Sequence, residues 1–501
     1  VTQSIVLTPG SVIDLSGGGY AGLTGKLKTG SDGLPIGKGG SLTLTTYLGG
    51  FPGRIAGNGQ GTNPFNVVPH GTNPDGSVNH PNQANIILGA TIYAGGFDGG
   101  GTLSLQVPTV VIDGTAGQVT SYLSGATANA LADVAVSGIA VSDAKAGQLV
   151  LPPSFFTGAF SQYTLSDING GTTVTAGTQL VLRQTNFLPT GHEMQIPTGT
   201  LVRSFVSVGQ LLDGLRQPVG LTLNSQTGIL VDTGSSIVTD PQATVTLNAA
   251  AIALSNGGTG TFAATTVLGS IVAPAGTINI SGNGVRIGAT ADLDVSGTFV
   301  PNPQVVAYST GTVLGGGTIT LASTFVNATS DNVPVVVEPG ARFDLRGAAV
   351  SAASNLIQLP QGGVAPRLVG QAAWSNGGSL QLLGTEVYFA GTVDASGGAP
   401  LASGGSLTIG NANNFPTAIV IESAGVVGAN LPAPNGSLTP GVFIGADTLS
   451  GSGFDSVTLN TQTIAFAGSM NVAIPGALTL NASFGNIVLL PASSGLLPSG
   501  V

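Results

Sequence analysis

Two short phrases recur along this chain of 501 residues and constrain its fold more than any other feature. The first is a Gly-Gly pair, or a looser equivalent, followed by alternating apolar and polar residues, and it occurs at 39–44, 100–105, 275–280, 316–321, 377–382, 404–409 and 475–480. A turn followed by such alternation is typical of a half-buried β-strand. A repeated strand indicates a repeat architecture, which has to be established before any single residue is interpreted.

The second phrase is an Asp between two apolar residues, with a glycine three positions after the Asp. It occurs at Asp14, Asp294, Asp344 and Asp394. Alternation places the Asp on the solvent face, where its carboxylate can accept N–H groups of the following turn. The last three copies are spaced 50 residues apart. At roughly 20–25 residues per coil, we expect two coils, or about 10 Å, between copies.

Strands that recur in constant register, joined by loops of variable length, predict coils stacked on one another. The predicted fold is therefore all-β, a right-handed parallel β-helix (a solenoid) with inserted loops. Composition agrees, because only 7% of the residues are charged and β-branched residues are abundant. We expect on the order of 20 coils and a rod roughly 100 Å long.

The phrases divide the chain into three parts. Residues 1–120 are predicted to form coils that carry a long polar loop at 57–85. Residues 121–225 lack the Gly-Gly phrase and collect aromatic residues, so we expect an irregular or inserted region there. Residues 226–501 return to the pattern and are predicted to form coils again.

Charge and composition exclude several classes of partner. The net charge is −10, whereas binding to nucleic acid requires a basic face. No run of 18 or more apolar residues is present, so the chain is not expected to insert into a membrane. The absence of cysteine fits bacterial export without disulfides.

One aromatic cluster is a candidate for ligand contact. It comprises Phe155, Phe156, Phe160 and Tyr163. An exposed cluster would offer a platform on which the apolar faces of sugar rings stack. Alternatively, the rings fill a widened coil or cover one end of the core, and we favour this second interpretation because a large exposed apolar patch requires a partner.

No metal or cofactor is expected. His70 and His80 flank Asp75 in the long loop, but their spacing matches no metal motif and His192 is distant in sequence, so we interpret them as exposed loop residues. The repeated aspartates could bind Ca²⁺ together with backbone carbonyls. Copies about 10 Å apart are too distant to share an ion, so we interpret them as solvated turn residues.

An enzyme is not expected either. A β-helix that cleaves acidic polysaccharides needs paired carboxylates, or carboxylate-bound Ca²⁺ with a basic residue. The 22 acidic residues are scattered along the sequence. Arg342, Asp344 and Arg346 alternate on one strand and share an outer face, which predicts a solvated ion-pair row more readily than a catalytic patch.

The repeated phrases together resemble the filamentous haemagglutinin family of large two-partner-secreted bacterial exoproteins. The resemblance rests on "IDLSGGG…GKGGSLTLTT" near the start and on the segment 269–297. The segments 149–183 and 240–254 are similar to one branch of long haemagglutinin-like surface proteins.

The resemblance implies a secreted protein located outside the cell or on the bacterial cell surface, exported through an outer-membrane β-barrel transporter. It implies an adhesin that attaches to cells or extracellular matrix through a glycan or a cell-surface receptor, and it brings no catalytic motif. The chain is expected to be an interior shaft segment. A passive spacer or matrix fibre remains an alternative, and a polysaccharide-degrading β-helix enzyme is a second one.

Overall fold

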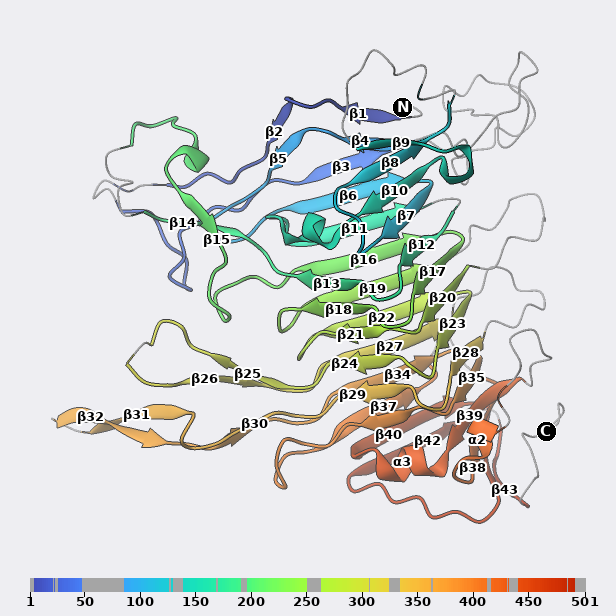
Figure 1. The fold of residues 1–501 in the computed structure, drawn as a ribbon. Helices are drawn as coiled ribbons and strands as arrows, with labels where there is room; N and C mark the ends of the chain where they lie inside the picture. The colour runs from blue at the N-terminus through green and yellow to red at the C-terminus, as the bar shows by residue number, and fades with distance from the viewer. Residues whose placement is uncertain are drawn as a thin grey trace.

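The structure is a computed structural model in which strands predominate. It describes residues 4–491 except 21, 23–25, 47–84, 126–127, 129–137, 168–169, 191–195, 250–262, 306, 324–333, 362–363, 412–415, 430, 432–439 and 484. Three long sheets contain most of the described strands, and nearly all pairs within them are parallel (Figure 1). The chain is therefore all-β, as predicted.

The first sheet has 11 strands, all parallel. In spatial order they are β3 (Leu42–Thr45), β6 (Thr102–Val107), β11 (Gln162–Asp167), β16 (Gly220–Ser225), β19 (Thr244–Ala249), β22 (Thr277–Gly282), β27 (Thr318–Ser323), β34 (Ser379–Leu383), β37 (Gly405–Ile409), β40 (Phe454–Thr461) and β42 (Ala477–Ala482). All seven Gly-Gly phrases lead into strands of this sheet, which confirms the predicted strands.

The second sheet has 14 strands. In spatial order they are β9 (Ile139–Val141), β8 (Thr120–Leu123), β10 (Gln148–Leu151), β7 (Thr109–Ile112), β12 (Thr172–Val174), β17 (Gly228–Val231), β20 (Ala264–Val267), β23 (Gly284–Ile287), β28 (Pro334–Val337), β35 (Glu386–Phe389), β39 (Gly441–Gly445), β38 (Ala418–Glu422), β41 (Thr463–Ala467) and β43 (Ile487–Leu490). Only β8 and β10 pair antiparallel within it.

The third sheet has six parallel strands. They are β13 (Gln179–Leu182), β18 (Ser236–Thr239), β21 (Ser270–Val272), β24 (Asp292–Asp294), β29 (Arg342–Asp344) and β36 (Thr392–Asp394). From β11 to β36 the chain visits the first, second and third sheets in that order, again and again. Each circuit adds one strand to the growing edge of each sheet.

The inner faces of all three sheets share one apolar core. Leu247 of β19, Val267 of β20 and Ile271 of β21 are fully buried and belong to the same cluster. The residues between the buried ones point outward, as the alternating pattern requires. Two-residue alternation in the sequence therefore sets which side chains fill the core.

Glycines permit the turns before the first sheet to stack closely. A Cβ on Gly317 would clash with the carbonyl oxygen of Gly276, and one on Gly378 would clash with that of Gly317. Gly405 stands in the same relation to Gly378. The repeated glycine is required because successive backbones meet at this turn without room for a side chain.

The spacing expected between the repeated aspartates was wrong. Asp294 pairs in register with Asp344, which pairs with Asp394, so the copies lie on adjacent strands about 4.8 Å apart. The circuit is 50 residues long because segments between the third and first sheets project out of the stack. The estimate of about 20 coils was wrong for the same reason, since the described residues place 11 strands in the first sheet.

The predicted role of these aspartates in the turn is confirmed. In each copy the Asp carboxylate accepts a hydrogen bond from the backbone N–H two residues later, at 2.7–3.1 Å. The flanking apolar residues of the last three copies, such as Leu293 and Val295, are buried on the opposite face. The Asp thus fixes the turn that ends each third-sheet strand.

The part of 121–225 that the structure describes is more regular than expected. It contributes β11 and β16 to the first sheet, β9, β10 and β12 to the second and β13 to the third. Its departures from the pattern are the antiparallel β8–β10 pair and the segment 183–219. The 57–85 loop lies outside the described residues except for Asn85.

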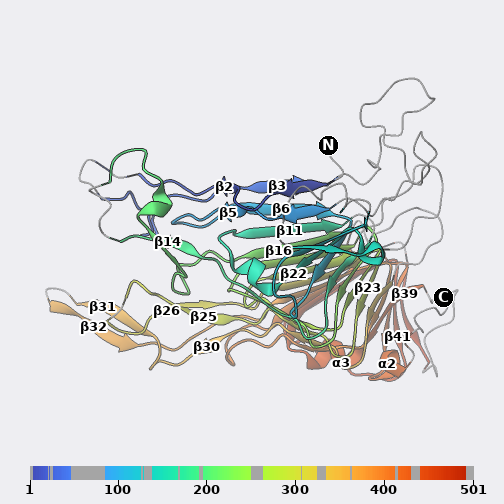
Figure 2. The same cartoon turned by 45° about the horizontal axis from the view of Figure 1, so that its top comes forward.

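Four segments that connect the third-sheet side of the molecule to the first sheet project from the stack and are called arms here. They are arm 1 (16–40), arm 2 (183–219), arm 3 (297–316) and arm 4 (347–377). The arms contain the antiparallel pairs β14 (Asn186–Leu188) with β15 (Ser207–Gly209), β25 (Thr298–Pro301) with β26 (Gly311–Leu314), β30 (Ala349–Val350) with β33 (Ala373–Trp374), and β31 (Leu356–Gln361) with β32 (Val364–Gly370). Figures 1 and 2 show arms 2, 3 and 4 on the same side of the molecule.

Helices are short and lie at the margins of the sheets. They include the 3-10 helices η3 (Asp143–Lys145), η4 (Pro153–Thr157) and η6 (Val202–Ser204), and the α-helices α2 (Val426–Ala429) and α3 (Ala446–Gly451). Two parallel pairs, β1 (Ile5–Leu7) with β4 (Ile86–Leu88) and β2 (Val12–Asp14) with β5 (Thr91–Tyr93), lie at the N-terminal end. Among the described residues, no helix has the length and apolar character needed to cross a bilayer.

Candidate functional surface: the arms

The aromatic cluster proposed for ligand contact lies in the core. Phe156 and Tyr163 are fully buried, Phe160 is nearly so, and Phe155 packs against the same core with part of its surface exposed. Their rings lie 5.2–6.2 Å apart in tilted and edge-to-face arrangements. Burial raises the pKa of Tyr163, which keeps the phenol neutral. The packing interpretation fits this geometry, and no aromatic platform is open to a sugar ring here.

The histidines considered as metal ligands, His70, His80 and His192, lie outside the described residues, as does Asp75. Within the described part of the chain, no group of three or more His, Asp or Glu side chains is placed to hold a metal ion.

The outer face of the third sheet carries an ion-pair row. Arg346 Nη2 lies 2.5 Å from Asp344 Oδ2, and its Nε lies 3.7 Å from Asp394 Oδ2 on the next strand. Arg342 stands opposite Asp292 in register and opposes the effect of burial, which raises the pKa of Asp292. The predicted ion pairs are confirmed for Arg346 with Asp344 and Asp394, whereas Arg342 forms no ion pair among the described residues.

Eight of the sixteen exposed large apolar side chains among the described residues lie on the arms. They are Tyr20 and Ile36 on arm 1, Leu201, Val208 and Leu212 on arm 2, and Leu359, Leu368 and Trp374 on arm 4. We call these residues the arm surface. Trp374, the single tryptophan of the chain, is 44% exposed. An exposed apolar patch marks an interaction site, which makes the arms the candidate surface for one.

The arms also contact one another. The Gln304 side chain of arm 3 donates a hydrogen bond to the Asp32 carbonyl of arm 1. The N–H of Leu356 in arm 4 donates to the Ser309 carbonyl of arm 3 at 2.7 Å. Arms 1, 3 and 4 are therefore linked by direct hydrogen bonds. Arm 2 contacts β5 near the middle of its sequence, where the Arg203 guanidinium lies 4.2 Å from the centre of the Tyr93 ring.

A buried ion pair fastens arm 2 to the sheets. Arg216, at the end of the arm, donates two hydrogen bonds to the Asp240 carboxylate, each 2.6 Å long. It also donates to the Leu211 carbonyl and to Asp213, both at 2.7 Å. The side chains of Arg216 and Asp240 are 4% and 8% exposed, and hydrogen bonding to Asp240 raises the pKa of Arg216. Burying the Arg216 charge costs free energy, and the two hydrogen bonds to Asp240, together with those to Leu211 and Asp213, offset that cost.

Two adjoining cavities lie where arms 1, 2 and 3 meet. One, of about 260 Å³, is bounded by Arg216 and Asp240 and by Val300 of arm 3. The other, of about 300 Å³, is bounded by Asp32 of arm 1, by Gly214 and by Val300. Their walls mix prolines and aliphatic groups with amides and hydroxyls, and the carboxylates of Asp213 and Asp240 are both bonded to Arg216. The chemistry offered is that of binding rather than of proton transfer.

The sequence reasoning missed the arm surface. The constant 50-residue spacing of the aspartates was the one available signal. One circuit of three short strands needs fewer than 50 residues, so the remaining residues of each circuit had to project from the sheets.

Comparisons with known proteins do not identify the chain. It matches no family model, no curated protein and no solved structure.

Proposed function

We propose that the three sheets form a right-handed parallel β-helix, and that the chain is a shaft segment of a secreted bacterial adhesin without catalytic activity. The repeated order of first, second and third sheet and their shared core support a solenoid. The handedness follows from the strong preference of parallel crossover connections. In this proposal the shaft supplies reach and rigidity, and the arms supply contact.

The observation that carries the proposal is that eight of the sixteen exposed large apolar side chains among the described residues lie on the arms. Surface loops that project from a rigid scaffold are common carriers of binding residues. Aromatic and aliphatic side chains such as Trp374 are also enriched at the energetic centres of interfaces. Several weak contacts along one side would add through avidity.

The proposed partners are a glycan or a receptor on a cell surface or in extracellular matrix. Export would use an outer-membrane β-barrel transporter, with the protein ending outside the cell or on the bacterial surface. Two properties suit this route. The chain has no cysteine that could close a loop before export, and a solenoid can nucleate at one end and fold by propagation.

The test is binding of the purified chain to a glycan array and to a panel of cultured cells, compared with a Trp374→Ser/Leu359→Ser/Leu368→Ser variant. Val181→Ser is the matched control, because Val181 is 41% exposed on β13, outside the arms. We expect the triple variant to lose binding and the control to keep it, with ligand addition shifting the Trp374 fluorescence of the intact chain. Binding that survives the triple substitution contradicts an adhesive arm surface. No binding by the folded chain favours the passive spacer.

A further inference from the structure

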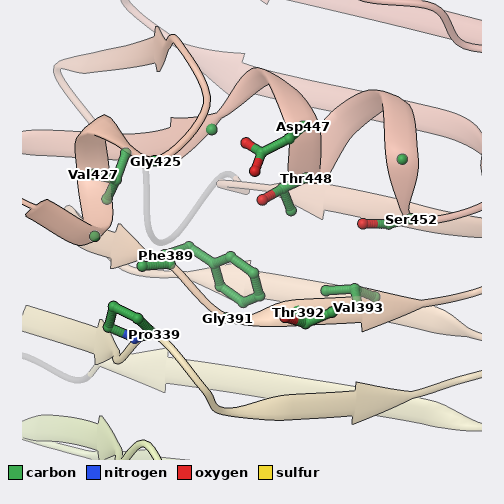
Figure 3. A pocket seen from close by; sticks show the side chains of 14 residues that line it. Pro339, Phe389, Gly391, Thr392, Val393, Gly425, Val427, Asp447, Thr448 and Ser452 are labelled. Atoms are coloured by element: carbon green, nitrogen blue, oxygen red, sulfur yellow. The ribbon is translucent and has the colours of Figure 1, made fainter.

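A different observation concerns the C-terminal edge of the third sheet. In the described part of the chain, the last strand of that sheet, β36, pairs on one side only, with β29. In the preceding circuits the place beside each third-sheet strand is taken by the next strand. Beside β36 the chain instead passes through α3, and Figure 3 shows the space between the helix and the strand.

The backbone of β36 presents hydrogen-bonding groups to this space. The Thr392 N–H donates to the Ala341 carbonyl at 2.8 Å, and the Asp394 carbonyl accepts from the Leu345 N–H at 2.7 Å, so these two residues face β29. In a parallel strand alternate residues point their backbone groups to opposite sides. The N–H and carbonyl of Val393 therefore face away from β29.

The open edge of β36 has a hydrogen-bond partner just beyond the C-terminal end of the strand. The Ala395 N–H, next in line on the open side, donates to the Ser452 carbonyl at 2.7 Å. Ser452 directly follows α3 and so takes the position that one residue of an added strand would occupy. Among the described residues, the backbone N–H and carbonyl of Val393 have no hydrogen-bond partner. They lie next to the hydrogen bond between Ala395 and Ser452, which has the position of the first bond to an added strand.

A cavity of about 370 Å³ adjoins this edge. The strand side is formed by Phe389, Gly391, Thr392 and Val393, and the helix side includes Asp447 and Thr448 of α3 (Figure 3). Further glycines complete the wall, at positions 425, 428, 445 and 451. Small residues at these positions leave room for a second backbone to approach β36 closely.

The charge of the cavity is negative. Asp447 is exposed, and it forms no ion pair within the described part of the chain. None of the described Lys and Arg side chains lines the cavity. An occupant carrying a positive charge is therefore favoured over a neutral or acidic one.

We propose that this cavity binds an extended basic peptide segment of another protein, which adds to β36 as the next strand of the third sheet. Strand addition supplies affinity through the backbone of Val393, and a Lys or Arg of the peptide pairs with Asp447. Because β36 has three residues, the paired part of the peptide spans about 10 Å. The inference does not depend on the arm surface, which lies elsewhere.

The test uses the folded chain and a fluorescently labelled acetyl-Ser-Val-Lys-Val-Ser-amide probe, followed by fluorescence polarisation. We expect saturable binding and compare two analogues, one methylated at the backbone nitrogens of both valines and the other at that of the lysine. Because alternate N–H groups face opposite sides of the strand, only one of the two analogues should lose binding. Replacing the probe lysine by glutamate, or introducing Asp447→Asn, should weaken binding about two- to fivefold.

Gly451→Leu is the blocking variant. Gly451 lines the cavity, and a Cβ there meets no atom within 4 Å, so the position has room for a larger side chain. Gly117→Leu is the matched control, because a Cβ there also meets nothing within 4 Å and Gly117 does not line the cavity. We expect at least tenfold weaker binding for Gly451→Leu only. Absence of probe binding to the folded chain, equal binding of both methylated analogues, or unchanged binding by Gly451→Leu would each overturn the proposal.

Discussion

Glu386 gives the sharpest prediction about stability. It begins β35 in the second sheet and is 5% exposed, and its Oε2 has no hydrogen-bond partner among the described residues. Its neighbours in register are Pro334, which has no N–H, and Gly441. Burial without compensation disfavours the ionised carboxylate and raises the pKa of Glu386 from 4.5 to about 7.

The size and sign of the effect follow from linkage. Below pH 4.5 the carboxyl is protonated in both the folded and the unfolded chain, so burying it does not lower the free energy of unfolding through its charge. As the pH rises toward 7 the unfolded chain releases the proton first, so the free energy of unfolding falls. Above pH 7 the loss is complete and amounts to at most about 3 kcal/mol.

Glu386→Gln keeps the shape of the side chain and removes the titration. We expect the variant and the parent to have equal urea midpoints at pH 4, and the variant to be more stable at pH 8 by up to about 3 kcal/mol. Glu338→Gln is the control, because Glu338 accepts hydrogen bonds from Arg286 and the Ala289 N–H and should lose stability when its charge is removed. A Glu386→Gln effect that is the same at pH 4 and pH 8, or destabilising at pH 8, would refute this reasoning.

The other predictions test the packing that positions the arms and the turns. Asp240→Asn leaves the buried Arg216 without its bidentate partner and should lower the free energy of unfolding by about 3–5 kcal/mol, measured by urea unfolding; no change would mean that the pair does not fasten arm 2. Gly317→Ala should destabilise the chain by clashing with the Gly276 carbonyl, whereas Gly117→Ala should not, and equal melting temperatures for these two variants would exclude close stacking at the turn.

The strands of the first sheet were predictable because their signal is local. In "GGTITL" at 316–321, glycines end the turn and Ile319 and Leu321 alternate with threonines, which determines both the strand and its buried face. The Asp phrase was predictable for the same reason, since the hydrogen bond from Ser296 to Asp294 spans two residues. Neither inference needs knowledge of distant contacts.

The remaining features depend on contacts that sequence spacing does not encode. The adjacency of Asp294 and Asp344 was missed because a segment of unknown shape separates them in the chain. In the second sheet β39 lies between β35 and β38, so the spatial order of β38 and β39 is the reverse of their order in the sequence. No local sequence pattern predicts this reversal. The arm surface and the free edge of β36 likewise arise from where segments leave the sheets, a property of packing and not of residue pattern.

The most direct test of the central claim is a pair of distances along the first sheet. The chain has no cysteine, so spin labels can be attached at introduced cysteines without interference. In the observed strand order, Thr164 on β11 is four strand spacings from Thr320 on β27 and seven from Thr458 on β40. Pulsed electron paramagnetic resonance should give narrow distributions near about 19 Å and about 34 Å. Equal distances for the two pairs, or broad distributions for both, would contradict a stack of parallel strands.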